Sequence, residues 1–416
     1  MSTEVRQITA TEHSAWAQTL NRGFLRAEPV TPGDVALRAA AGELGRVQGA
    51  FDSETGGCVG TFRSFAQELT VPGGATVTAS AVTNVSVLST HRRQGLLTRM
   101  MAAEFAAATA RGDVLSTLIA AEYPIYGRYG YGPAVYVAEW EIDVARTGLD
   151  SRRAAPAAGG GGRIELVDVA EVRRSGPALH ERIRATRHGM TGRTARWWRL
   201  ATGEEEFSFR PYKPKLHAVY RTAAGEVAGL VSYRSDDHWT DAKVPLNTLR
   251  VDELLAATPE AERALWHFLC SVDWALRIRT GLRATDDLAP GLLPDPRAAA
   301  ILTHADFLWV RVLDVVRALG ARTYEVPGVL VLEVTDPAGL SGGRFRLDAG
   351  TGRCEATGDP ADLRLDVAAL GSLYLGDGSA VRLGALGQIT ELRPGALALA
   401  DAVFRTSSKP WSPDVF

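Results

Sequence analysis

Hydrophobic positions change their spacing within VTNVSVLSTHRRQGLLTRMMAAEFAAA, residues 82–108 of the chain. The first part is rich in β-branched residues, which is typical of a strand. The second part has apolar residues at helical spacing, at Leu97, Met100, Met101, Phe105 and Ala108. The pattern therefore predicts a strand that leads directly into a helix, with the corner at Thr90–Leu96.

The chain before and after this corner alternates between the two periods. A helical pattern covers Thr11–Phe24, and strand-like runs cover Val47–Phe51, Val59–Leu69 and VLSTLIA at 114–120, with a Pro-Gly-Gly turn at Pro72. This alternation predicts an α/β fold with a mixed sheet.

Two breaks in composition divide the chain into three lobes. SRRAAPAAGGGGR, residues 151–163, has little to bury and is typical of a linker. LAPGLLPDPRAAA, residues 288–300, interrupts the apolar pattern before LWVRVLDVVRALG, which we expect to begin a helix. The sequence thus predicts a first lobe at 1–148, a linker at 149–162, a second lobe at 163–290 and a third lobe at 291–416.

Composition narrows the classes of partner. The 416 residues carry a net charge of −2, which argues against nucleic acid and against a charged membrane surface as binding partners. No apolar run approaches the ~18 residues of a membrane span, and MSTEVRQITATEH lacks the apolar core of a signal peptide, so we expect a cytoplasmic protein. The three cysteines and eight histidines follow no metal-ligand spacing, so we expect buried thiols and no metal.

The strand-to-helix corner has the residues of an anion site. The first N–H groups of a helix lack internal partners and carry the positive end of the helix dipole. Gly95 would let an anion approach the backbone, and Arg92 and Arg93 would add guanidinium groups suited to pyrophosphate oxygens. The alternative for these residues alone is a solvated helix start with surface arginines.

The corner resembles motif A of the GNAT acetyltransferases, [QR]-x-x-G-x-[GA], at Arg92 and Gly95, although Leu97 replaces the small last residue. Together with IYGRYGYGPA at 125–134, THRRQGLLTRMM is similar to the Eis (enhanced intracellular survival) family of GNAT enzymes. The similarity continues in TARWWRL at 194–200 and in the ending LYLGDGSAVRLGALGQITELRPGALALADAVF.

The resemblance implies two tandem GNAT-like lobes with mixed sheets and a C-terminal sterol-carrier-protein-like α/β lobe. It implies acetyl-CoA as the cosubstrate, bound only by the first lobe, and a homo-oligomer, a hexamer. The residues that match the family's cofactor site are Val85, Ser86, Val87, Arg92, Arg93, Gln94, Gly95, Leu96 and Leu97. Lipid binding by the third lobe is not expected, because a carrier-like fold does not establish a lipid cavity.

Acetyl transfer from a thioester to an amine needs a base for the ammonium and an acid for the leaving thiolate. By its match to the family's I-Y-G-R-[FY]-G-Y-G motif, Tyr126 carries the general-acid role. A phenol with a pKa near ~10 is protonated at neutral pH, as an acid must be. The other four tyrosines in and around this loop are expected to pack.

The resemblance assigns the general base to the C-terminal carboxylate, which here belongs to Phe416. The ending KPWSPDVF is stiffened by two prolines, and Trp411, Val415 and Phe416 are expected to be buried. Two alternatives stay open: the Asp414 side chain is the base, or the ending only fastens the third lobe to the first.

The acceptor is a primary amine, of the aminoglycoside or lysine type by resemblance. Within NRGFLRAEPVTPGDVALR, residues 21–38, Phe24, Glu28 and Asp34 could bind a cationic amine, whereas Arg26 would repel a polyamine. The alternatives are a GNAT enzyme that uses another acyl-CoA or acceptor, and a non-catalytic CoA-binding regulatory protein.

Overall fold

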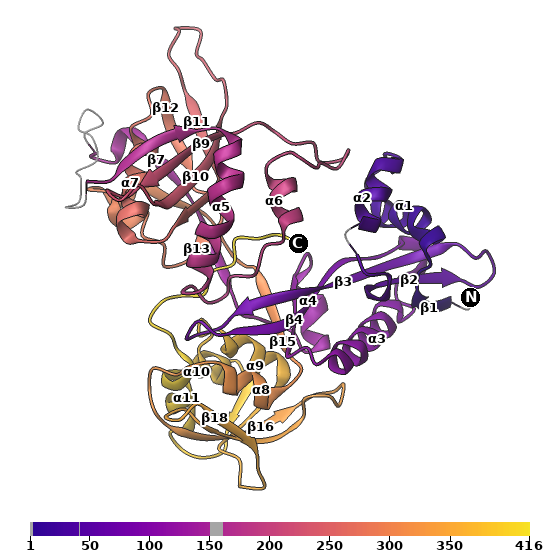
Figure 1. The fold of residues 1–416 in the computed structure, drawn as a ribbon. Helices are drawn as coiled ribbons and strands as arrows, with labels where there is room; N and C mark the ends of the chain where they lie inside the picture. Colours follow the sequence, from indigo (N-terminus) through magenta and orange to yellow (C-terminus); the bar gives the residue numbers. More distant parts are fainter. Residues whose placement is uncertain (1–2, 41, 150–160) are drawn as a thin grey trace.

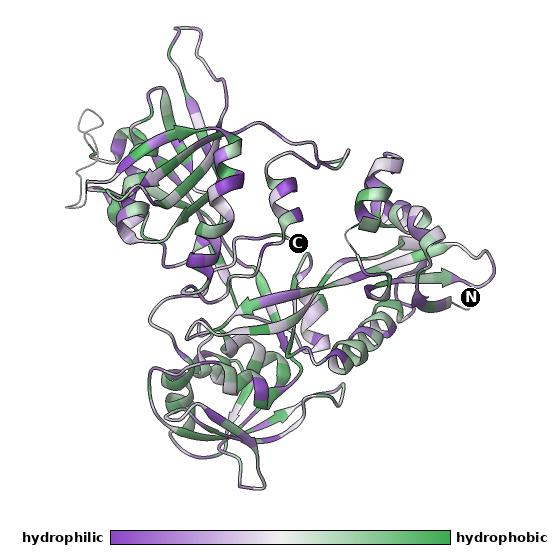
Figure 2. Ribbon diagram, viewed as in Figure 1, coloured by the Kyte–Doolittle hydropathy of each residue, from purple (hydrophilic) through white to green (hydrophobic). Residues whose placement is uncertain are grey.

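The structure is a computed structural model that describes residues 3–40, 42–149 and 161–416, so most of the predicted linker lies outside the described residues. Three sheets in these residues form three lobes, and the predicted α/β architecture is confirmed (Figure 1). Apolar residues gather where helices face the sheets (Figure 2).

The first sheet has the strand order β1-β2-β3-β4-β5-β15-β6, and only β4 and β5 are parallel neighbours. Its strands are β1 (Thr3–Gln7), β2 (Val47–Asp52), β3 (Cys58–Thr70), β4 (Thr76–Val87), β5 (Leu115–Ile119), β6 (Gly132–Pro133) and β15 (Leu308–Val312). Its helices are α1 (His13–Gly23), α2 (Pro32–Ala40), α3 (Leu96–Arg111) and α4 (Tyr123–Tyr126), with short 3₁₀ turns η1 (Ala10–Glu12), η2 (Leu44–Arg46), η3 (Ser89–His91) and η4 (Gly127–Tyr129).

The second sheet has the order β13-β7-β12-β11-β10-β9-β8, and β14 also pairs with β7. Its strands are β7 (Tyr136–Asp143), β8 (Arg163–Val167), β9 (Leu216–Arg221), β10 (Val227–Ser235), β11 (Asn247–Ala256), β12 (Ala275–Arg279), β13 (Arg283–Ala284) and β14 (Ala299–Asp306). Its helices are α5 (Val169–Arg184), α6 (Ala195–Ala201) and α7 (Pro259–Cys270), with turns η5 (Val144–Arg146), η6 (Pro290–Leu292) and η7 (Pro296–Ala298).

The third sheet has the order β18-β17-β16-β19-β20. Its strands are β16 (Val329–Thr335), β17 (Gly343–Asp348), β18 (Arg353–Ala356), β19 (Leu363–Asp366) and β20 (Ile389–Glu391). Its helices are α8 (Val315–Ala321), α9 (Val367–Tyr374), α10 (Ala380–Ala385) and α11 (Ala396–Phe404).

Strands cross the lobe boundaries that the sequence predicts. β7 precedes residue 148 but lies in the second sheet, where it pairs with β12, β13 and β14. β15 follows residue 291 but lies in the first sheet, between β5 and β6. β7 therefore joins the first predicted lobe to the second sheet, and β15 joins the third predicted lobe to the first sheet.

The prediction of a helix that begins at Leu308 is wrong for the first half of that segment. Leu308–Val312 forms β15, all five residues of which are buried, and α8 begins only at Val315 after its N-cap Asp314. A strand buried on both faces shows no alternation of polar and apolar residues, so its apolar run resembles a buried helix in the sequence.

Candidate functional site

The central strands of the first sheet separate at one end. The β4–β5 ladder runs from Ala79–Leu115 to Val82–Leu118, and β4 then continues to Val87 without β5. An extra residue in β4 shifts its register against β3, and Asn84 there has a φ of 55°. Such a bulge turns the strand away from its neighbour. An extended ligand arm could therefore enter between β4 and β5 and pair with the free edge of β4.

Three predicted cofactor residues lie on this edge of β4: Val85, Ser86 and Val87. The Ser86 side chain is buried on the α1 side, because a Cβ added to Gly23 would come within 1.6 Å of its Oγ. Ser86 can therefore contribute only backbone groups to a ligand between the strands.

The predicted anion corner connects β4 to α3. Arg92, Arg93, Gln94 and Gly95 are all exposed, and Gly95 is the N-cap of the 16-residue α3 with a φ of 72°. A Cβ added at Gly95 would meet no heavy atom within 4 Å, so the space in front of the helix start is open. This geometry suits a pyrophosphate, because the first N–H groups of the helix and the guanidinium groups lie around an accessible space.

Other side chains hold the corner in place. Leu96 is buried in the core beside Met100, and Leu97 is half-buried, so both contribute backbone rather than side-chain groups to a ligand. His91 Nε2 lies 3.3 Å from Asp52 Oδ2, and Thr90 Oγ1 lies 2.8 Å from His91 Nδ1. The Thr55 backbone N–H and His91 lower the pKa of Asp52 to about 2, so this carboxylate stays charged.

The matching corner of the second lobe cannot bind an anion in the same way. β11 and β12 are parallel like β4 and β5, and α7 connects them. However, the Thr258 side chain already accepts the Ala261 N–H, and Glu260 and Glu262 place negative charge in the first turn of α7. Phosphate groups would be repelled there.

Tyr126 lies at the end of α4, just after β5, and its side chain packs with Leu96 and Met100 of α3. It is 8% exposed, and burial together with the Glu122 carboxylate raises its pKa to about 12. No described residue hydrogen-bonds to its hydroxyl, whereas the hydroxyls of Tyr129 and Tyr131 are bonded to Thr98 and Ser116. Tyr126 thus keeps its proton at neutral pH and can give it to a ligand.

The chain end lies on the first sheet, between that sheet and α6 of the second lobe (Figure 1). The Phe416 ring meets Phe65 of β3 edge-on, with centroids 5.4 Å apart. Phe65 pairs with Ala81 of β4, one residue before the position where β4 and β5 separate. The geometry therefore brings the last residue close to the gap between the strands.

The residues before Phe416 are fixed to the second lobe. Trp411 is buried, and its backbone N–H donates to the His188 carbonyl over 3.0 Å. Val415, which we expected to be buried, is 61% exposed, because the chain passes from the second lobe to the first at this residue.

Asp414 is less suited to be the base than the chain end. Arg193 Nη2 lies 2.7 Å from one Asp414 oxygen and Nε lies 3.0 Å from the other. Arg193 is itself buried and also pairs with Glu253 over 2.6 Å. The Asp414 carboxylate is thus held as part of a buried ion triad rather than facing the first lobe as an unpaired group.

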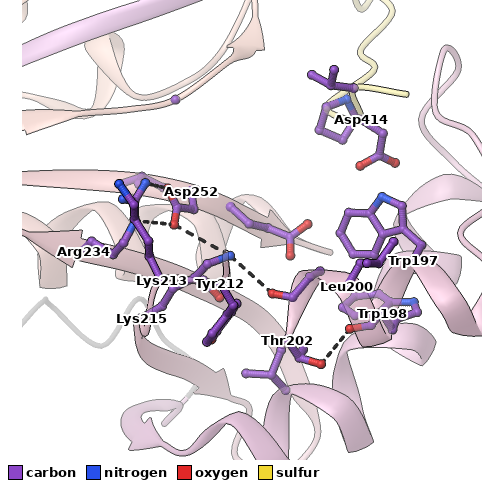
Figure 3. A pocket seen from close by; sticks show the side chains of 18 of the residues that line it. Trp197, Trp198, Leu200, Thr202, Tyr212, Lys213, Lys215, Arg234, Asp252 and Asp414 are labelled. Carbon is purple, nitrogen blue, oxygen red and sulfur yellow. Dashed lines mark hydrogen bonds and ion pairs between the residues drawn. The ribbon is translucent and has the colours of Figure 1, made fainter. Parts of the chain in front are cut away.

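A pocket of about 740 Å³ lies beside this ending, on the α5 and α6 face of the second sheet. Figure 3 shows Trp197 and Trp198 on one side, Tyr212 and Lys213 on another, and Asp414 above them. Asp252 in its floor binds Arg234 and Lys215, over 2.6 and 3.7 Å. The segment TARWWRL contributes Trp197, Trp198 and Leu200 to the lining of this pocket.

The residues predicted to bind the acceptor amine differ in their exposure and in the contacts they already make. Phe24 and Glu28 are exposed, and the Arg26 guanidinium lies over Phe209 at 4.2 Å. Asp34 cannot bind a cationic amine, contrary to our expectation. Its two oxygens accept hydrogen bonds from Ser208 and Thr31, so it anchors α2 to the second lobe.

Among the described residues, no group of three or more His, Cys, Asp or Glu side chains is arranged to hold a metal ion. Within the same residues, no helix has both the length and the hydropathy needed to cross a membrane.

Comparison with known families agrees with this architecture. Residues 4–134 and 189–312 each match an acetyltransferase (GNAT) domain, and residues 315–413 match a sterol carrier protein domain. The GNAT matches imply that the chain binds an acyl-CoA.

Individual relatives cover nearly the whole chain. A Streptomyces avermitilis protein described as an uncharacterized N-acetyltransferase is 57% identical over 99% of this chain and 98% of its own length. The N-acetyltransferase Eis of Mycobacterium tuberculosis is 36% identical over 81% of this chain and 80% of its own. The crystal structure of Eis1 from Mycobacterium abscessus is 33% identical, with a TM-score of 0.85 and full coverage of both chains. The chain is therefore an N-acetyltransferase that belongs to the Eis family of GNAT enzymes.

Proposed function

We propose that the protein transfers an acetyl group from acetyl-CoA to a primary amine, of the aminoglycoside or lysine type, in the cytoplasm. One observation supports this proposal: β4 and β5 separate on the strand that leads to the anion corner, Tyr126 follows β5, and the Phe416 ring packs on Phe65 of the neighbouring β3. Bound acetyl-CoA would supply an activated thioester carbonyl.

The chain's own groups would then act on protons and charge. The Phe416 carboxylate takes a proton from the substrate ammonium, so that a neutral amine attacks directly. A backbone N–H on the free edge of β4, at Val85 or Val87, stabilises the negative charge that develops on the carbonyl oxygen. The Tyr126 hydroxyl protonates the departing sulfur, and its high pKa keeps the proton available at neutral pH. The attacking nitrogen loses its second proton as the amide forms, and this proton restores the Tyr126 hydroxyl.

A turnover assay tests this proposal. The purified protein is mixed with acetyl-CoA and a panel of amines that includes an aminoglycoside and a lysine peptide, and free thiol and acetylated product are measured. We expect stoichiometric thiol and N-acetyl product with at least one amine. Transfer only from a longer acyl-CoA would reassign the donor, and binding of acetyl-CoA without any transfer would indicate a regulatory CoA-binding protein.

We also propose that the chain forms a homo-oligomer, a hexamer by analogy with its family. Sedimentation velocity should then give a species of about six times the 44.5 kDa chain mass. A monomeric species at working concentration would contradict it.

A further inference from the structure

Four arginines from the first two lobes converge around α2, and we call them the arginine cluster: Arg26, Arg38, Arg63 and Arg196. The guanidinium groups of Arg26 and Arg38 lie over the Phe209 ring, 4.2 and 5.4 Å from its centroid. Arg196 of α6 donates to the Leu37 carbonyl over 2.6 Å, one residue before Arg38.

The arginine cluster lies close to the predicted general base. Arg63 and Phe65 are two residues apart on β3, so their side chains share one face of the sheet about 7 Å apart. Phe65 carries the Phe416 ring at 5.4 Å. Arg63 also pairs with Thr83, the first residue of β4 beyond the β4–β5 ladder. A ligand that reaches both the gap and the chain end therefore passes this cluster.

Positive charge exceeds negative charge at this place. The nearby carboxylates include Asp34, whose oxygens accept from Thr31 and Ser208, Glu205, which Arg196 and Arg199 share, and the chain end at Phe416. Burial and repulsion by Arg196 and Arg38 lower the pKa of Arg63 to about 10, which leaves it charged at neutral pH.

Arg38 is a buried member of the cluster that lacks a hydrogen-bond acceptor. It is 8% exposed, and no described residue forms a hydrogen bond or ion pair with it, so its buried Nε has no acceptor. It lies over the rings of Phe207 and Phe209 instead, at 5.2 and 5.4 Å. A buried cation without an acceptor is costly unless a ligand supplies the negative charge.

The pocket of Figure 3 connects this region to the chain end. Its wall contains Phe207, over which Arg38 lies, and Val415, the neighbour of Phe416. Arg210 and Lys213 in the same wall form no ion pair with any described residue. The same wall also holds the carboxylates of Glu205, Glu206, Asp252, Glu253 and Asp414. Each of these already accepts from a neighbouring residue, whereas Arg210 and Lys213 can meet an anionic group.

We propose that the amine acceptor also carries an anionic group, such as a carboxylate, which the arginine cluster binds while the amine faces Phe416. The proposal rests on the function proposed above and narrows its acceptor. It favours amino acids and acidic peptides, and disfavours polycationic amines, which the cluster would repel. The alternative is that the arginines only join the lobes through their contacts with Phe207 and Phe209.

Three acceptors of equal chain length separate these two roles: ε-aminocaproate with a remote carboxylate, hexylamine with a remote methyl group, and hexamethylenediamine with a remote ammonium. We expect kcat/KM with acetyl-CoA to fall in that order, with about tenfold or more between the first and the last at low salt. Because the discrimination is electrostatic, about 0.5 M salt should reduce the difference.

Two variants that each remove one positive charge test whether the arginine cluster causes the discrimination between the three acceptors. Arg38→Leu should lower kcat/KM for ε-aminocaproate about tenfold, leave hexylamine nearly unchanged and improve hexamethylenediamine. Arg263→Leu is the matched control, because Arg263 lies exposed on α7, which covers the opposite face of the second sheet. It should leave the order of the three acceptors unchanged.

The outcomes distinguish this inference from the proposed function. If none of the three amines is acetylated and no thiol is released, the proposed function itself is in doubt. If hexylamine is acetylated but the charged acceptors react equally, or the diamine reacts best, the anionic-acceptor proposal is overturned. If Arg38→Leu fails to fold, the order of the three acceptors and its salt dependence in the unaltered protein still decide the question.

Discussion

Gly95 is the residue at which cofactor binding can be separated from folding. A Cβ there would meet no protein atom within 4 Å, so the structure should tolerate a valine at a cost of about 1–2 kcal/mol for the left-handed φ. Its side chain would, however, occupy the space that a pyrophosphate needs. We expect Gly95→Val to remain folded by circular dichroism and to lose acetyl-CoA binding by calorimetry.

Arg93→Ala should weaken acetyl-CoA binding by about 1–3 kcal/mol through the loss of a charged hydrogen bond. Arg99→Ala is a matched control one turn further along α3, since the Arg99 guanidinium donates to the Thr3 carbonyl over 2.7 Å instead of facing the corner. Unchanged affinity in both Gly95→Val and Arg93→Ala would place the cofactor elsewhere.

Tyr126→Phe removes the proposed acid without opening a cavity. Because no described residue hydrogen-bonds to the Tyr126 hydroxyl, stability should hardly change. If Tyr126 protonates the leaving thiolate, kcat should fall by about 10²-fold or more while acetyl-CoA affinity stays nearly constant. A variant with full kcat would show that water or another group supplies the proton.

The raised pKa of Tyr126 also predicts the pH profile. A group with a pKa of about 12 remains protonated at all lower pH values, so the acid is not lost on going from pH 7 to about 10. The rate should therefore rise with pH as the substrate amine loses its proton and then stay level. A decline with an apparent pKa between about 8 and 10 in the folded protein would point to a different acid.

For single residues, the sequence points to candidates that belong to a local motif. It does not reveal residues that only the fold brings together. Arg92 and Gly95 became candidates because strand, turn and helix are adjacent in the chain, and Tyr126 became one through its match to the family motif. Arg38 was not recognised as part of a site, because Arg63 and Arg196 come from other elements. Asp34 was misinterpreted because its partner Ser208 is 174 residues away.

Among the elements, the C-terminal segment is the one on which activity should depend most sharply. Appending residues to Phe416 would move the carboxylate, so a short C-terminal tag should abolish most activity, whereas the same tag at Met1 should be harmless. The measurement is kcat for the two tagged proteins beside the untagged chain.

A semisynthetic amide at Phe416 separates charge from packing. It keeps the contact between the Phe416 and Phe65 rings and removes only the negative charge. If the carboxylate is the base, the amide should bind acetyl-CoA normally, turn over slowly at neutral pH and recover at high pH, where the amine is already neutral. Full activity of the amide at pH 7 would leave the ending with a packing role only.

Helix α1 and several strands of the first sheet were predictable, whereas β15 was not. The amphipathic α1 and the strands β2, β3 and β5 lie where the sequence pattern indicates. β15 was taken for a helix, because its burial depends on β5 and β6, which pair with it from nearly 200 residues away. The local sequence pattern carries no information about pairing partners so distant in the chain.

On the scale of the whole molecule, the lobes share both strands and a core. The exchange of β7 and β15 means that no single cut of the chain leaves the first sheet and the second sheet complete. One hydrophobic cluster also contains Leu115 and Val310 of the first sheet together with Leu332 and Phe404 of the third lobe. Folding of the first lobe should therefore depend on the rest of the chain.

We predict that the isolated fragment 1–148 does not form an acyl-CoA site. Without β15, the edge of β5 would be unpaired, and without the second sheet the inward residues Trp140 and Ile142 of β7 would be exposed. Unpaired strand edges and exposed apolar side chains favour aggregation over folding. The fragment alone should show no cooperative thermal unfolding and no binding of acetyl-CoA by calorimetry.

Co-expression with fragment 149–416 should restore both, because the second fragment supplies β15 and the partners of β7. The full chain should unfold in one calorimetric transition for its first and second lobes. If fragment 1–148 alone bound acetyl-CoA as tightly as the full chain, the exchanged strands would be dispensable and the two lobes would be independent domains joined by a linker.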